Sequence, residues 1–93
     1  MQRNIVKANY YSRFAYEKGY LPIAPHTIFP QFLSDDNAQE RKEGMLMGLQ
    51  LLEMCEELWV FGPFISEGMK KEIEYARHRG MTTRYFSEGL EET

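Results

Sequence analysis

The strongest strand signal in the sequence is the run Glu57-Leu58-Trp59-Val60-Phe61, which Gly62-Pro63 ends. A short run of aromatic and β-branched residues favours a buried strand, and a Gly-Pro pair favours a turn after it. The run Thr82–Phe86 indicates another strand. Between the two runs Ser66 can cap a helix and Gly80 can end it, so the spacing predicts a helix over residues 66–79. Two strands separated by a helix predict a parallel pair.

A second helix is predicted over residues 38–55, and it carries two apolar stripes. One stripe contains Met45, Leu49 and Leu52, and the other contains Met47, Leu51 and Met54. A helix that is apolar on two sides is buried on two sides. In so small a chain, the second stripe predicts self-association through Met47, Leu51 and Met54. The alternative is that Met47 and Met54 are ordinary surface methionines.

The first third of the chain predicts a helix, a strand and a loop. Asn4 can cap a helix that runs to Lys18, and Gly19 can end it. Leu21–Ala24 is short and apolar, which indicates a buried strand that Pro25 stops. The segment Pro25–Asn37 contains further turn residues, so we expect a long ordered loop there, of the kind that is often functional.

The alternation of helices and strands predicts an α/β fold with a three-layer, Rossmann-like (flavodoxin-like) parallel sheet. The chain has 93 residues, which predicts a single domain over residues 1–93. A hydrophobic content of 43% excludes a disordered chain, and a net charge of −3 argues against a nucleic-acid binder. No apolar stretch is long enough for a membrane span, and no signal peptide is recognisable. With a single cysteine, these features predict a cytoplasmic protein.

Ligands of open parallel sheets bind outside the carboxyl ends of the strands, which directs attention to residues 61–68. Free N–H groups and the dipole at a helix start favour an anion, so Gly62, Ser66, Gly68 and Met69 are candidate ligand-binding residues. The segment is not a Walker loop, and the alternative is an ordinary capped helix. Glu72 follows beside the inward stripe of this helix. It is a candidate nucleophile or general base, and the alternative is a solvated surface glutamate.

A second candidate segment follows the strand expected at Leu21–Ala24. His26 would be well placed there for proton transfer, although a structural hydrogen bond explains it equally well. Phe29 can stack on a base, and the alternative is a role in the core. The pair Asp35-Asp36 is either a turn or cap, or a general acid. His26, His78 and Cys55 have no metal-ligand spacing, so we predict no metal and no cofactor.

Five stretches give the chain a family resemblance, because they occur together and in this order. They are Tyr11-Ser12-Arg13-Phe14-Ala15, Gly19-Tyr20-Leu21-Pro22-Ile23-Ala24-Pro25-His26, Phe29-Pro30-Gln31-Phe32-Leu33, Glu57-Leu58-Trp59-Val60-Phe61-Gly62 and Ile65-Ser66-Glu67-Gly68-Met69. Over nearly its whole length the chain resembles a small family of bacterial and phage proteins. That family is in turn similar to the nucleoside 2-deoxyribosyltransferases.

The resemblance implies a function through the stretch Ser66-x-Gly68-x-x-x-Glu72. Deoxyribosyltransferases and deoxynucleotide N-hydrolases carry a similar stretch after a central strand, and there the Glu is the nucleophile. By this resemblance Glu72 attacks C1′ of a deoxyribose, while Ser66 and Gly68 hold a 5′-hydroxyl or phosphate. The expected partner is therefore a small nucleoside or nucleotide. The alternatives are a nucleotide-binding module without catalysis and an oligomeric scaffold.

One departure from the transferases concerns the start of the chain. The resemblance implies a first strand that ends in a loop with Gly, Pro and an aromatic residue and lines the nucleoside pocket. Here the first residues, Met1-Gln2-Arg3-Asn4, already lead into the first helix. We therefore expect a truncated sheet, either because the gene start is truncated or because another chain fills the gap.

Overall fold

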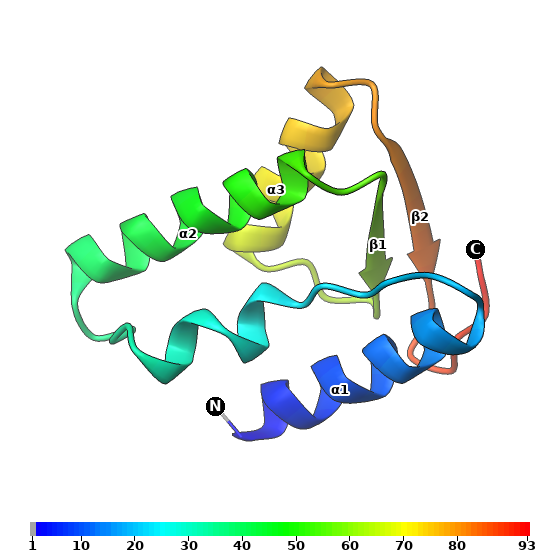
Figure 1. The fold of residues 1–93 in the computed structure, drawn as a ribbon, viewed down its shortest axis with the longest axis horizontal. Helices are drawn as coiled ribbons and strands as arrows, with labels where there is room; N and C mark the ends of the chain where they lie inside the picture. Colours follow the sequence, from blue (N-terminus) through cyan, green and yellow to red (C-terminus); the bar gives the residue numbers. More distant parts are fainter. Residues whose placement is uncertain (1) are drawn as a thin grey trace. The chain divides into compact units, whose positions relative to one another are not determined.

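The structure is a computed structural model that describes residues 2–93, with side chains described for residues 7–25 and 27–93. The chain divides into two compact units, residues 1–44 and residues 45–93, and each is described by itself. In chain order the elements are α1 (Gln2–Glu17), the short 3-10 helices η1 (Pro25–Thr27) and η2 (Phe29–Gln31), α2 (Ala38–Glu53), β1 (Glu57–Phe61), α3 (Glu67–His78) and β2 (Thr82–Phe86) (Figure 1).

In the first unit, α1 confirms the predicted helix and its predicted end. Gly19 has a φ of +92°. The N–H of Tyr20 donates to the carbonyl of Ala15 at 3.0 Å and that of Gly19 to Tyr16 at 2.9 Å, which is the bonding pattern that closes a helix at a left-handed residue. The predicted cap is wrong, because α1 begins at Gln2 and Asn4 therefore lies inside the helix.

The strand predicted at Leu21–Ala24 is absent, since this segment has no regular secondary structure. Pro22 sits inside the segment and has no N–H to donate to a neighbouring strand. Leu21 is 89% exposed, so the segment is not the buried run that its apolar residues suggested. The chain continues instead into η1, where the Thr27 hydroxyl donates to the carbonyl of Ala24 at 2.7 Å.

The helix α2 starts where the sequence predicted and ends two residues earlier. The side-chain oxygen of Asn37 accepts from the N–H groups of Gln39 and Glu40 at 2.9 and 3.0 Å, which caps the helix. The helix ends at Glu53, so Met54 and Cys55 lie beyond it. Met54 is 80% exposed.

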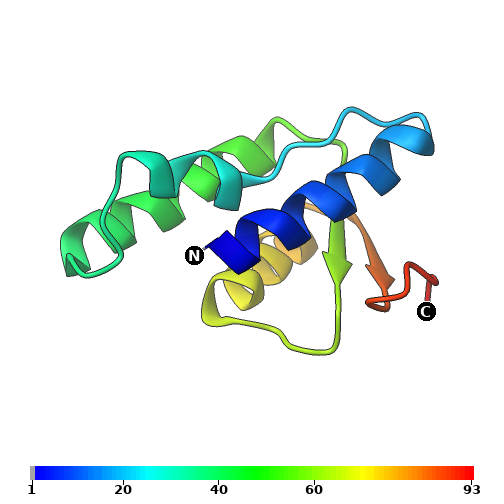
Figure 2. The ribbon, with the colours of Figure 1, turned by 90° about the horizontal axis from the view of Figure 1, so that it is seen from below.

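The second unit is built around β1 and β2, which pair in parallel with Glu57 opposite Thr82 and Phe61 opposite Phe86. The chain connects them through α3, which lies beside the two strands in both ribbon views (Figures 1 and 2). This parallel pair with its helical connection confirms an α/β class. Within residues 2–93 the sheet has two strands.

The helix α3 agrees with its predicted bounds and signals. Gly80 follows it with a φ of +69°, and the N–H of Met81 donates to the carbonyl of Ala76 at 2.8 Å. This closes the helix as Gly19 closes α1. Ala76 is fully buried, and Val60 in the neighbouring strand is 4% exposed. These two residues mark the core between the helix and one face of the sheet.

The other face of the sheet carries a cluster of aromatic rings around one arginine. The Phe86 ring lies 4.9 Å from Trp59 and 5.1 Å from Phe61, measured between ring centroids. The Arg84 guanidinium lies 4.7 Å above the Trp59 ring, in cation–π range. The same guanidinium contacts two carboxylates, Glu57 at 3.7 Å and Glu92 through two bonds of 2.8 Å. Arg84 therefore ties β1, β2 and the segment after β2 together.

This arrangement predicts that Arg84→Gln lowers the free energy of unfolding by about 1–2 kcal/mol, because a charge-assisted fork and a cation–π contact are lost. The side chains of Arg84 and Glu57 are only about a quarter exposed, whereas Glu92 is 45% exposed and better screened. The matched control is Arg77→Gln, which removes an exposed pair with Glu74 and should change stability by no more than ~0.5 kcal/mol. Urea unfolding compares the two variants, and equal losses would contradict the assigned role of Arg84.

Candidate functional site

The candidate site lies where β1 ends and α3 begins. Gly62, with a φ of +86°, follows β1, and its N–H donates to the carbonyl of Phe86 at 2.9 Å. Ser66 is extended and caps α3, because its hydroxyl oxygen accepts from the N–H of Met69 at 3.2 Å. The predicted cap is thus confirmed. Ser66 is exposed, and its hydroxyl hydrogen remains a donor for a ligand oxygen.

Glu72 lies in the second turn of α3 and is half-buried. Helical side chains lean toward the N-terminus, so the side chain of Glu72 covers the turn that contains Gly68, four residues earlier. A Cβ built on Gly68 would meet only the Ser66 hydroxyl within 4 Å, at 3.9 Å. Glycine at this position therefore keeps side-chain atoms out of the space between the Ser66 hydroxyl and the turn beneath Glu72.

The second unit thus contains five of the seven predicted site residues: Gly62, Ser66, Gly68, Met69 and Glu72. The other two, His26 and Phe29, belong to the first unit. The side chain of His26 is outside the described residues. Phe29 packs edge-on against Phe32, with ring centroids 6.1 Å apart, but Phe32 is 63% exposed and η2 has no buried residue, so Phe29 does not belong to the core.

Glu88 is a residue at this site that the sequence did not single out. A Cβ built on Gly62 would meet the Cγ of Glu88 at 3.6 Å and its Oε1 at 3.9 Å, so this side chain lies over Gly62. Glu88 belongs to the turn after β2, in which the N–H of Leu90 donates to the carbonyl of Ser87 at 3.0 Å. The predicted topology was the one signal for the position of Glu88, because the segments that follow two neighbouring parallel strands leave the sheet at the same edge.

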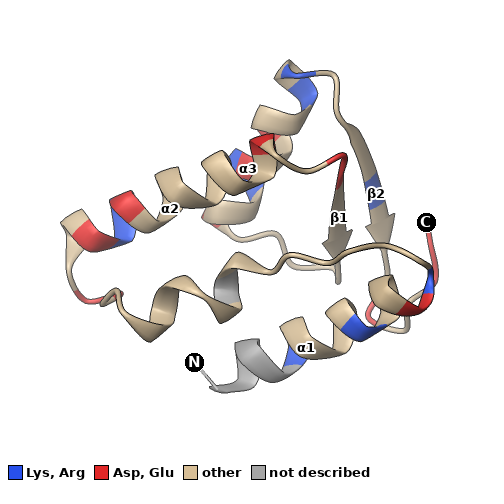
Figure 3. Cartoon of the chain, viewed as in Figure 1, with Lys and Arg blue, Asp and Glu red and all other residues tan. Residues whose placement is uncertain are grey.

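The acidic pair Asp35-Asp36 lies in the first unit, in the turn that precedes α2. The N–H of Asp36 donates to the Ser34 hydroxyl at 3.3 Å, and the carbonyl of Asp35 accepts from Arg41 at 3.2 Å. Acidic and basic positions alternate along the first turns of α2 (Figure 3). Asp35-Asp36 therefore forms a turn, which was one of the predicted roles of the pair. The cap of α2 is supplied by Asn37.

No group of three or more His, Cys, Asp or Glu side chains able to hold a metal is found among the described residues. Burial raises the pKa of the Cys55 thiol, which donates to the carbonyl of Leu51 at 3.3 Å. A raised pKa leaves less thiolate at neutral pH, so Cys55 is a poor nucleophile. Within residues 2–93 no helix is long and apolar enough to cross a membrane.

These features define a small α/β protein whose candidate site combines a capped helix start with a half-buried carboxylate one turn along. The chain belongs to the family described as Domain of unknown function (DUF7768), whose model matches residues 1–86. No curated protein and no solved structure matches the chain.

The capping geometry predicts a ranking of variants at position 66. Ser66→Ala should lower the free energy of unfolding by roughly 1 kcal/mol, because the N–H of Met69 loses its acceptor. Ser66→Asp supplies another acceptor and should be close to the native protein, while Ser66→Gly should cost only a few tenths. Thermal unfolding measures all three, and an alanine variant as stable as the aspartate variant would contradict the cap.

Proposed function

We propose that this protein breaks the N-glycosidic bond of a nucleoside or nucleotide, with Glu72 as the nucleophile. The observation that carries the proposal is the Ser66-x-Gly68-x-x-x-Glu72 stretch at the start of α3, directly after β1. The resemblance to deoxyribosyltransferases and deoxynucleotide N-hydrolases rests on the same stretch. The parallel pair joined by α3 supports the finer expectation of a three-layer, Rossmann-like sheet.

The reaction follows the double displacement of retaining glycosidases. A carboxylate oxygen of Glu72 forms a bond to C1′ while the bond from C1′ to the base nitrogen breaks. The electron pair of that bond goes to the base, which takes a proton. Water then attacks C1′ and releases the sugar from Glu72, losing a proton as it does so. A second base in place of water gives transfer in place of hydrolysis.

The surroundings of Glu72 support this role. Partial burial removes some of the water that would otherwise solvate and weaken a carboxylate nucleophile. The Ser66 hydroxyl is a donor for a 5′-oxygen of the sugar, and the helix start favours a partial or full negative charge there. Glu88, which lies over Gly62, is an acceptor for a sugar hydroxyl.

The test is base release from a panel of deoxynucleosides and their 5′-monophosphates, followed by chromatography with and without an acceptor base. Glu72→Gln keeps the shape of the side chain but removes the nucleophile, and it should reduce release by at least about a thousandfold. The matched control is Glu74→Gln on the same helix. Glu74 is 62% exposed and pairs with Arg77, so its loss should leave the rate within about twofold.

Three outcomes would overturn the proposal. Release that persists in Glu72→Gln removes Glu72 as the nucleophile. A nucleotide that binds saturably and is never cleaved favours the binding module without catalysis. If no nucleotide binds and the protein forms a stable oligomer, the result favours the alternative of an oligomeric scaffold.

The scaffold alternative has one supporting observation of its own, which also bears on self-association. Met47 and Leu51 are half-buried, while Met54 is 80% exposed. We propose that a second copy of the chain covers Met54. Met54→Glu would place a charge in that contact, so light scattering should show a weakened association by roughly tenfold or more. A strict monomer at high concentration would refute the contact.

A further inference from the structure

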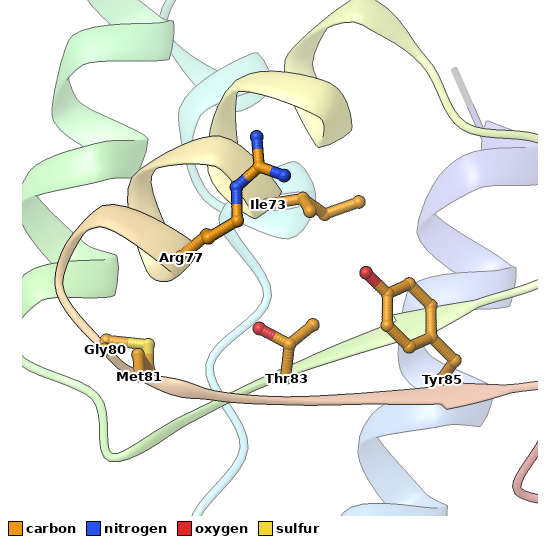
Figure 4. Close-up of a pocket in the computed structure, with 6 residues that line it drawn as sticks. All are labelled: Ile73, Arg77, Gly80, Met81, Thr83 and Tyr85. Atoms are coloured by element: carbon orange, nitrogen blue, oxygen red, sulfur yellow. The ribbon is translucent and has the colours of Figure 1, made fainter.

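The second unit contains a hollow at the end of α3 opposite to Ser66. Its lining residues are Ile73 and Arg77 of α3, Gly80 and Met81 of the following turn, and Thr83 and Tyr85 of β2 (Figure 4). The volume is about 390 Å³. This lies within the range of small-molecule sites, which are concave and carry few polar groups. None of these residues belongs to the proposed glycosidic site.

Each polar side chain of the hollow can donate a hydrogen bond: the guanidinium of Arg77 only donates, and the hydroxyl groups of Thr83 and Tyr85 donate or accept. Thr83 and Tyr85 are two residues apart on β2, so their side chains point to the same face of the sheet. In Figure 4 the Thr83 and Tyr85 side chains rise from β2 toward α3, while the Arg77 guanidinium stands beside Ile73 on the α3 side of the hollow. No Asp or Glu is among the lining residues. An anion fits such a set of donors better than a cation or a neutral group does.

Arg77 keeps donors for a ligand although it already has a partner. Its Nη2 donates to the carboxylate of Glu74 at 2.7 Å, on an exposed side of the helix. A guanidinium has five N–H donors, so most of them remain after this contact. Arg77 also opposes the negative end of the α3 dipole, which would otherwise disfavour an anion here.

The rest of the hollow is apolar and suits a flat ring. Ile73 and Met81 line it with aliphatic and thioether groups. In Figure 4 the Tyr85 side chain points toward Ile73, while Met81 lies at the other end of the hollow, beyond Thr83. Thioethers and aromatic rings both make favourable contacts with an aromatic ligand. From these residues we infer a second binding site, for a small aromatic carboxylate whose acid group pairs with Arg77 and whose ring lies against Ile73 and Tyr85.

The test is an NMR titration of the isotope-labelled full chain with benzoate. Saturable shifts of the amides of Gly80, Thr83 and Tyr85 are expected at ligand concentrations up to about 10 mM. Benzamide has nearly the same shape without the charge and should bind roughly tenfold more weakly. Absence of saturable shifts at these three amides would overturn the assignment.

Variants then separate a site at Arg77 from a general effect of charge. Arg77→Gln should weaken benzoate binding roughly tenfold, and Tyr85→Phe, which keeps the ring, severalfold. Arg79→Gln makes the same charge change two residues on, where the arginine pairs with Glu53 at 3.1 Å, and should leave the affinity unchanged. Equal losses in the two arginine variants would contradict the site. Glu72→Gln should bind benzoate like the native protein, so this result does not depend on the proposed enzyme activity.

Discussion

The parallel pairing of β1 with β2 is the constraint on which the second unit depends. Parallel neighbours cannot be joined by a tight hairpin, so the chain between them must cross over, and here it does so as α3. The same pairing makes the segments after both strands emerge at one edge, which is why Glu88 lies over Gly62. It also sets Arg84 beside Trp59 across the ladder, where its charge meets Glu57 and Glu92. A slip of one residue would send Arg84 to the face that packs on α3, where Ala76 and Val60 are buried.

The elements that were predictable are those whose signals are local. The strand at Glu57–Phe61, the cap at Ser66 and the helix end at Gly80 each depend on residues within a few positions of one another. The spacing of Gly68 and Glu72 belongs to the same class, because a separation of four residues places two positions on one helix face wherever the helix lies. Five of the six residues of the candidate site, all except Glu88, could therefore be singled out from the sequence, because they share one loop and one helix start.

What the sequence could not give depends on contacts between distant residues or on backbone hydrogen bonding. Leu21–Ala24 is apolar enough for a strand, yet Pro22 removes a donor from the middle of the segment and Leu21 stays in solvent. Asn4 is a good cap residue, but α1 already begins at Gln2. Glu88 carries no local sign of its position, since only the pairing of β1 with β2 brings its turn to Gly62. The resemblance to deoxyribosyltransferases differs from these features, because it depends on one local stretch of seven residues, Ser66 to Glu72. It supports the proposal.

The two ends of α3 offer different groups to a ligand, so the two proposed sites can be tested independently of each other. At the N-terminal end the N–H groups of the first turn, the Ser66 hydroxyl and Gly68 lie near the turn beneath Glu72, and our proposal places the sugar there. At the C-terminal end the carbonyls of Ala76 and Arg77 are already bonded to the N–H groups of Met81 and Gly80, and the donors that remain come from Arg77, Thr83 and Tyr85. A ligand at this second end meets fixed side-chain donors and an apolar ring surface, and it meets no carboxylate able to attack it among the lining residues. We therefore assign ligand binding alone to the hollow, and the proposed bond cleavage to the end that carries Glu72.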